Sequence, residues 1–86
     1  MKVEDMKIGH AYEMIYDWKE FGKHKFQCIY LGRHNICRER FEFKCIKDFD
    51  TGNYKVEPGT RAACGIKNII KIIREIPEEE YIFELI

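Results

Sequence analysis

The chain has 86 residues, with 15 basic and 15 acidic residues and a hydrophobic content of 45%. This length predicts one domain over residues 1–86, and the composition excludes a disordered chain or one that net charge draws to nucleic acid or membranes. No apolar run approaches the roughly 20 residues of a membrane span. No secretion signal is visible either, so we expect a cytoplasmic protein that binds no membrane and keeps its cysteines reduced.

Residues 11–18 alternate in polarity with a period of two, which predicts a strand. Its apolar face consists of Tyr12, Met14, Tyr16 and Trp18. A turn follows, in which Gly22 is the residue suited to backbone angles that other residues avoid.

Residues 25–31 and 41–47 alternate in the same way and predict an antiparallel hairpin. In the simplest register Cys28 lies opposite Cys45. The side chains expected to face inward are Phe26, Cys28, Tyr30, Phe43 and Cys45. The connection between the two strands is polar and begins with a glycine, which is typical of a surface loop. A second turn, over residues 48–54, leads to Tyr54 and Val56.

Residues 60–77 fit two structures. Six isoleucines share one arc of a helical wheel, so periodicity favours an amphipathic helix at about residues 61–76. Strand is favoured because β-branched isoleucine loses rotamer freedom in a helix and Gly65 would weaken a helix by about 1 kcal/mol. The last segment, residues 81–86, is compatible with a further strand.

The succession KIGHAYEMIY, FQCIYLG, FEFKCI and IKNIIKIIREI, with a turn before the last segment, resembles an SH3-like small β-barrel. In such barrels a one-turn helix, here IKNI, often leads into the last strand. The resemblance covers residues 7–76 and leaves an acidic C-terminal segment at residues 77–86. It implies a mainly β fold of five to six antiparallel strands, and a binding module more often than an enzyme. The alternative is an α+β fold with a helix at about residues 61–76.

The histidines and cysteines raise the question of a metal site. His24 and Cys28 would lie about 13 Å apart along a strand, whereas zinc ligands lie within about 2.3 Å of one ion. His34 and Cys37 belong to the loop, and the spacings match no zinc knuckle. We therefore expect no metal and no cofactor, with Cys28 and Cys45 as core thiols. His34 and Cys37 remain a hypothetical half-site that a partner chain would complete.

Catalysis is not expected. Cys37 has basic neighbours, which suit a thiolate, but no oxyanion hole or phosphate-binding glycine loop is recognisable. Glu78, Glu79 and Glu80 are consecutive rather than opposed across a cleft, so they do not indicate the carboxylate pair of a hydrolase. The sequence predicts a non-catalytic protein.

Charge is distributed unevenly along this neutral sequence. The first hairpin loop is basic, whereas residues 75–86 contain five glutamates and no basic residue. The candidate binding residues are Arg33, His34, Arg38 and Arg40 in the loop and Glu78, Glu79 and Glu80 in the tail. The simpler interpretation is that both runs are solvated faces that partly neutralise each other.

Two binding functions fit these residues. The neutral net charge favours a protein partner, bound by the aromatic side chains, the acidic tail or the basic loop. A phage or bacterial accessory protein that inhibits a nucleic-acid-handling enzyme, with glutamates in place of phosphates, is one such function. In the alternative, Arg33, Arg38 and Arg40 contact the phosphates of a nucleic acid, and Tyr30 or Phe41 stacks on a base if its ring is exposed.

Overall fold

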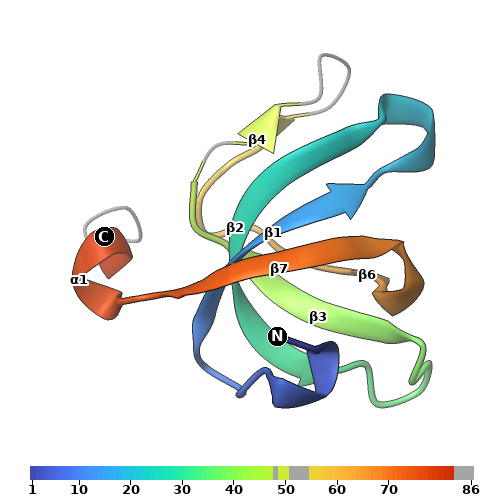
Figure 1. Ribbon diagram of the computed structural model, residues 1–86, viewed down its shortest axis with the longest axis horizontal. Helices are drawn as coiled ribbons and strands as arrows, with labels where there is room; N and C mark the ends of the chain where they lie inside the picture. The colour runs from blue at the N-terminus through green and yellow to red at the C-terminus, as the bar shows by residue number, and fades with distance from the viewer. Residues whose placement is uncertain (48, 51–54, 83–86) are drawn as a thin grey trace.

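A computed structural model describes residues 1–47, 49–50 and 55–82, and most of their regular structure is strand (Figure 1). The strands are β1 (Ala11–Asp17), β2 (Lys23–Arg33), β3 (Arg40–Cys45), β4 (Phe49–Asp50), β5 (Lys55–Val56), β6 (Arg61–Gly65) and β7 (Ile69–Ile76). The helical turns are η1 (Val3–Asp5), η2 (Lys19–Phe21), η3 (Ile66–Asn68) and α1 (Glu78–Tyr81). The expected mainly β fold class is therefore confirmed. No helix in the described part of the chain is long and apolar enough to cross a membrane.

Five strands form one antiparallel sheet in the order β6-β3-β2-β1-β7. The two edge strands, β6 and β7, are joined only by the three residues of η3 (Figure 1). The sheet must therefore curl so that its two edges approach each other next to η3. The hydroxyl of Tyr16 on β1 donates to the carbonyl of Gly65 at 2.9 Å there. Among the described residues no ladder joins β6 to β7, so the sheet is curved without closing as a barrel. The SH3-like resemblance stays a prediction.

The alternative of a helix at about residues 61–76 is wrong. These residues form β6, η3 and β7, and only Ile66–Asn68 is helical, where the one-turn helix was expected. β7 has register shifts against β1 that leave Ile70 and Ile73 without a partner in the ladder. Their side chains are among the exposed large hydrophobics, which explains why the isoleucines of a strand imitate a helical pattern.

The compatibility of residues 81–86 with a strand is also corrected where the structure describes them. Tyr81 ends helix α1 and Ile82 keeps helical backbone angles, whereas residues 83–86 lie outside the described residues. Pro77 supplies the fixed φ of –63° from which this turn starts. Within the expected turn at 48–54, Phe49–Asp50 form β4, which pairs with β5, whereas residues 48 and 51–54 are outside the described residues.

The predicted hairpin is confirmed in its register and its facing. Cys28 pairs with Cys45, Tyr30 with Phe43, and every residue expected to face inward is buried. The rings of Phe26 and Phe43 meet edge to face with centroids 5.4 Å apart. Burial, the largest cause, raises the pKa of the Cys28 thiol. The cysteines of this hairpin thus act as small core hydrophobes.

The face of β1 is confirmed as well. Tyr12, Met14 and Tyr16 are buried, and Trp18 packs against the same core. Gly22 takes the expected left-handed angle, with φ of +84°. A second, smaller cluster of Ala11, Ile46 and Ile76 receives Tyr81 of α1, so it fixes the C-terminal turn to the sheet.

Candidate protein-binding surface

The loop between β2 and β3, residues 34–39, is held by its own hydrogen bonds. The backbone N–H of His34 donates to the carbonyl of Arg40 at 2.9 Å, and that of Arg40 donates to the carbonyl of Cys37 at 3.0 Å. The Nδ1 atom of His34 accepts from the backbone N–H groups of Ile36 at 3.3 Å and Cys37 at 3.1 Å. The loop therefore presents its tip in a defined conformation without any apolar core of its own.

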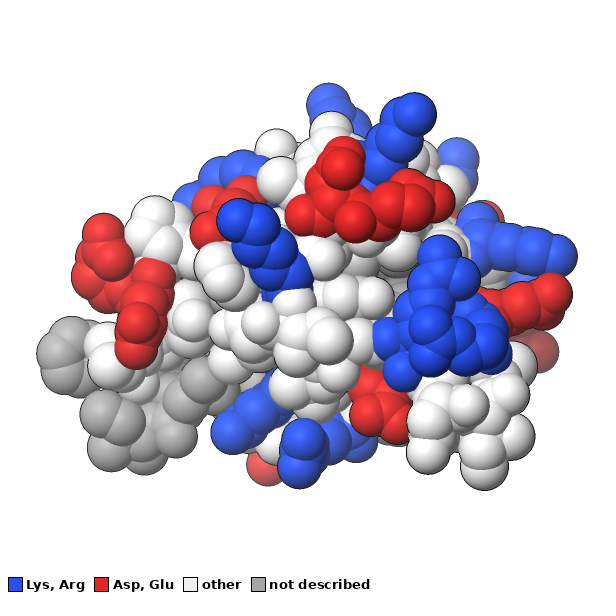
Figure 2. Space-filling model, turned by 90° about the horizontal axis from the view of Figure 1, so that it is seen from below, with Lys and Arg blue, Asp and Glu red and all other residues white. Residues whose placement is uncertain are grey.

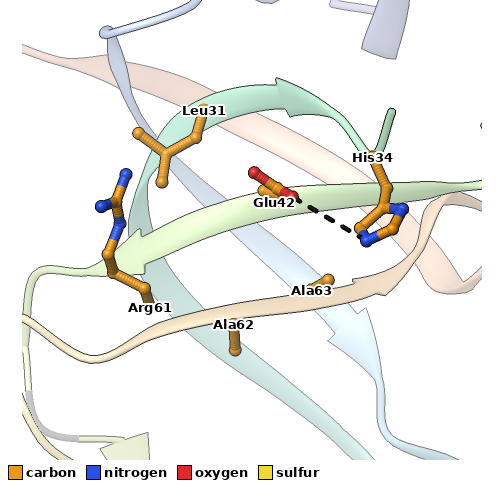
Figure 3. Close-up of a pocket in the computed structure, with 6 residues that line it drawn as sticks. All are labelled: Leu31, His34, Glu42, Arg61, Ala62 and Ala63. Carbon is orange, nitrogen blue, oxygen red and sulfur yellow. Dashed lines mark ion pairs between the residues drawn. The ribbon is translucent and has the colours of Figure 1, made fainter. Parts of the chain in front are cut away.

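This role of His34 argues against the hypothetical metal half-site. Because Nδ1 accepts from two N–H groups, the neutral ring carries its proton on Nε2 and has no lone pair there for a metal. The Nε2 atom instead points toward the carboxylate of Glu42 at 4.0 Å (Figure 3). Within residues 1–47, 49–50 and 55–82 no group of three or more potential ligands gathers around one point.

The three arginines predicted to bind a partner differ in whether their side chains already make hydrogen bonds within the protein. Arg40 donates from Nη2 to the carbonyl of Ala63 at 2.9 Å, so it ties β3 to β6. Arg33 donates from Nη1 to the carbonyl of Arg38 at 3.2 Å and supports the loop. The exposed side chain of Arg38 makes no hydrogen bond or ion pair among the described residues.

Arg33 and Arg38 stand between two hollows. One, of about 370 Å³, is also lined by Ile8, Tyr30 and neighbouring residues of the N-terminal segment. The other, of about 240 Å³, is also lined by Glu39, Ile66 and Lys67. Basic side chains gather at this end of the molecule, to the right in Figure 2. The two hollows and the arginines between them form one uneven surface, on which Arg33, Arg38 and Lys67 exceed Glu4 and Glu39 by one charge.

Two of the most exposed large hydrophobic side chains belong to the same region. Ile36 at the loop tip is 85% exposed and Ile8 is 71% exposed. Gly32 lets Ile8 lie over the end of β2, because a Cβ at this position would stand 3.2 Å from the Cδ1 of Ile8. With φ of +103°, Gly32 also has a backbone conformation that other residues resist. We call Ile8, Arg33, Ile36, Arg38, Ile66 and Lys67 the loop surface.

Four of the six residues of the loop surface thus escaped the sequence reasoning. The apolar members Ile8 and Ile36 and the distant residues Ile66 and Lys67 were not proposed for binding. Ile36 had a signal, since it is an isolated apolar residue within a polar loop. Lys67 had none, because only the pairing of β6 with β3, in which Gly65 lies opposite Arg40, brings η3 beside the loop.

The acidic candidates lie elsewhere. Helix α1 projects from the end of the molecule opposite the β2–β3 loop, so the loop and the tail do not form one site (Figure 1). Glu80 pairs with Arg74 at 2.8 Å, and Arg74 also pairs with Glu13 at 3.5 Å. The hydrogen bond to Glu80 is the main cause that raises the pKa of Arg74. Glu78 and Glu79 are exposed and make no ion pair among the described residues.

A third hollow, of about 260 Å³, opens on the outer side of β2, β3 and β6. It is lined by Leu31, His34, Glu42, Arg61, Ala62 and Ala63 (Figure 3). Glu42 and Arg61 bring opposite charges to it, so it has no clear preference for the charge of a ligand. Its position leaves it outside the loop surface.

The condition for base stacking, an exposed ring at Tyr30 or Phe41, is not met. Tyr30 is only 6% exposed and Phe41 is fully buried, with their ring centroids 6.2 Å apart inside the core. No described aromatic side chain is exposed, the most accessible being the half-buried Trp18, Phe21 and Tyr81. Base stacking therefore has no platform among the described residues.

No protein-family model, no curated protein and no solved structure matches this chain.

Proposed function

We propose that this chain is a non-catalytic, cytoplasmic binding module whose loop surface takes an acidic segment of a protein partner. The observation that carries the proposal is the exposure of Ile36, at 85%, on a loop that five hydrogen bonds hold in place. An apolar side chain presented to water contributes little to folding. Held on a fixed loop close in sequence to Arg38, it has the form of an interface anchor.

The charges and hollows define the chemistry of the partner. Arg38 and Lys67 are exposed and without ion-pair partners among the described residues, so carboxylates would find cations there. Ile8, Ile36 and Ile66 supply apolar contact beside them. A segment that combines glutamate or aspartate with a few large apolar side chains matches both features.

The nucleic-acid alternative fits less well. Phosphates would accept hydrogen bonds from Arg38 and Lys67, but Arg40 is already bound to the Ala63 carbonyl. The aromatic platform on which single-stranded binding depends is also missing from the described residues. Exposed isoleucines contribute nothing to phosphate contact, which is why we favour a protein partner. An inhibitor whose glutamates replace phosphates remains a secondary proposal, because Glu80 is paired with Arg74.

The test compares two labelled probes by fluorescence anisotropy at low and moderate salt. One is a short synthetic peptide that alternates glutamate with leucine, and the other is a single-stranded oligonucleotide of similar charge. We expect the peptide to bind more tightly. Ile36→Ala should weaken peptide binding by roughly tenfold, as loss of a buried aliphatic contact of about 1.5 kcal/mol predicts.

Two controls make this result specific. Ile73→Ala removes another exposed isoleucine, on β7, and should leave peptide affinity unchanged. A peptide with serine in place of leucine should bind as weakly to the native protein as the leucine peptide binds to Ile36→Ala. Tight oligonucleotide binding that ignores Ile36, together with no peptide binding, would replace our proposal with the nucleic-acid alternative.

A further inference from the structure

The chain itself contains a segment, helix α1 with Ile82, whose acidic and apolar side chains match those of the partner proposed above. Helix α1 presents Glu78 and Glu79, both exposed and without ion-pair partners among the described residues. The same turn continues into Ile82, which is 41% exposed. Two carboxylates next to one large apolar side chain are what Arg38, Lys67 and the isoleucines of the loop surface would bind.

We propose that the loop surface of one copy binds helix α1 of a second copy, so that the chain associates head to tail. This inference rests on the proposed function and names its partner. The two surfaces lie at opposite ends of one molecule and carry opposite charge (Figures 1 and 2). A single copy therefore cannot satisfy its own loop surface with its own α1, whereas two copies can.

The geometry also sets the strength and the form of the assembly. Different surfaces of the two copies meet, so each added copy leaves one loop surface and one α1 unoccupied, and open chains can grow. The helix has four residues, so the buried area is small and the contact belongs to the weak, transient class. Exposed charges steer it, so moderate salt should weaken it.

The first test is sedimentation velocity at increasing protein concentration, up to about 1 mM, where weak interfaces of this class associate. Two variants reverse one end each: Arg38→Glu with Lys67→Glu, and Glu78→Lys with Glu79→Lys. None of these four side chains makes a hydrogen bond that holds the fold in the described structure. We expect the native protein to self-associate. The association constant of each variant alone should be at least tenfold lower, and a mixture of the two variants should associate again.

A matched control separates a local effect from net charge. Lys19→Glu with Lys23→Glu changes the net charge by the same amount as the Arg38→Glu and Lys67→Glu variant, but near η2, away from both surfaces, and should self-associate like the native protein. If either end-reversed variant associates as the native chain does, or if the mixture stays monomeric, head-to-tail binding is overturned.

The second test uses a native thiol to locate the contact. Of the four cysteines, all within the described residues, only Cys37 is exposed. In Glu79→Cys protein, a short bismaleimide should join residue 37 of one copy to residue 79 of another, as mass spectrometry of the peptides would reveal. Lys23→Cys protein provides the control, and equal yields of the 37–79 and 37–23 products would overturn the proposal.

These outcomes distinguish the inference from the proposed function. If the native chain stays monomeric at every concentration while the glutamate–leucine peptide binds in an Ile36-dependent way, the second copy is excluded as partner and the binding surface stands. If the peptide fails to bind as well, both proposals fall.

Discussion

The strands and the loop of the β2–β3 hairpin differ in how much apolar surface they bury. The paired strands bury Phe26, Cys28, Phe43 and Cys45 against one another, so their side chains supply the free energy of folding. The loop buries almost nothing and leaves Ile36 in water, yet five hydrogen bonds fix its shape. We propose that this rigid segment, which contributes little apolar burial, contacts a partner, and substitutions in the two parts should therefore have different effects.

The largest effect is expected in the strands. Phe43→Ala removes a buried ring that contacts Phe26 and Phe41, and substitutions of this kind cost about 3–5 kcal/mol. Since a domain of this size has a stability of about 5 kcal/mol, the variant should be largely unfolded at room temperature. Circular dichroism with urea titration measures this. A variant that keeps the native midpoint would show that the facing of β3 does not govern stability.

Alkaline pH should also destabilise the core. Burial is the largest cause that raises the pKa of both Cys64 and Tyr16 to about 12, from ordinary values of 9.0 and 10.0. The fold favours the neutral groups, so this stability is complete below about pH 9 and is lost as pH rises toward about 12. Melting temperatures measured across this range should fall.

Two cysteine variants sharpen the same experiment. Cys64→Ala should make the loss above about pH 9 smaller, because one of the buried groups whose pKa burial raises is then absent, while Cys28 and Tyr16 still titrate. Cys37→Ala, at the exposed thiol, should melt like the native protein at every pH. A native protein whose melting temperature is constant from neutral pH to pH 11 would contradict this picture of the core.

A smaller, local effect is expected at the base of the loop. His34→Ala removes the acceptor of the Ile36 and Cys37 amides, a loss of about 1 kcal/mol of local stability. Hydrogen exchange at these two amides should become several times faster, with little change in the strands. His34→Asn offers an oxygen acceptor at a similar distance from the backbone and should restore much of the protection. Equal exchange in all three proteins would show that the imidazole does not order the loop.

The difference between the buried strands and the exposed loop also explains which features could be predicted from the sequence. Alternation of apolar residues predicted the inward set of β1, β2 and β3, because a strand with one buried face has a strict period of two. The isoleucines of β7 follow a helical rather than a strand periodicity, because the unpartnered Ile70 and Ile73 break the period of two. Arg33 and Arg38 were predicted from charge alone. Ile66 and Lys67 were beyond sequence reasoning, because the long-range pairing of β6 with β3 determines their place beside the loop.

The most direct measurement takes stability and affinity from one protein, Ile36→Ala. Its free energy of unfolding should stay within about 0.5 kcal/mol of the native value, as is usual for exposed positions. Its affinity for the acidic, leucine-containing peptide should fall by roughly tenfold. A variant that loses more than about 1 kcal/mol of stability and binds the peptide unchanged would contradict the assignment of the loop as a binding surface, because Ile36 would then support the fold.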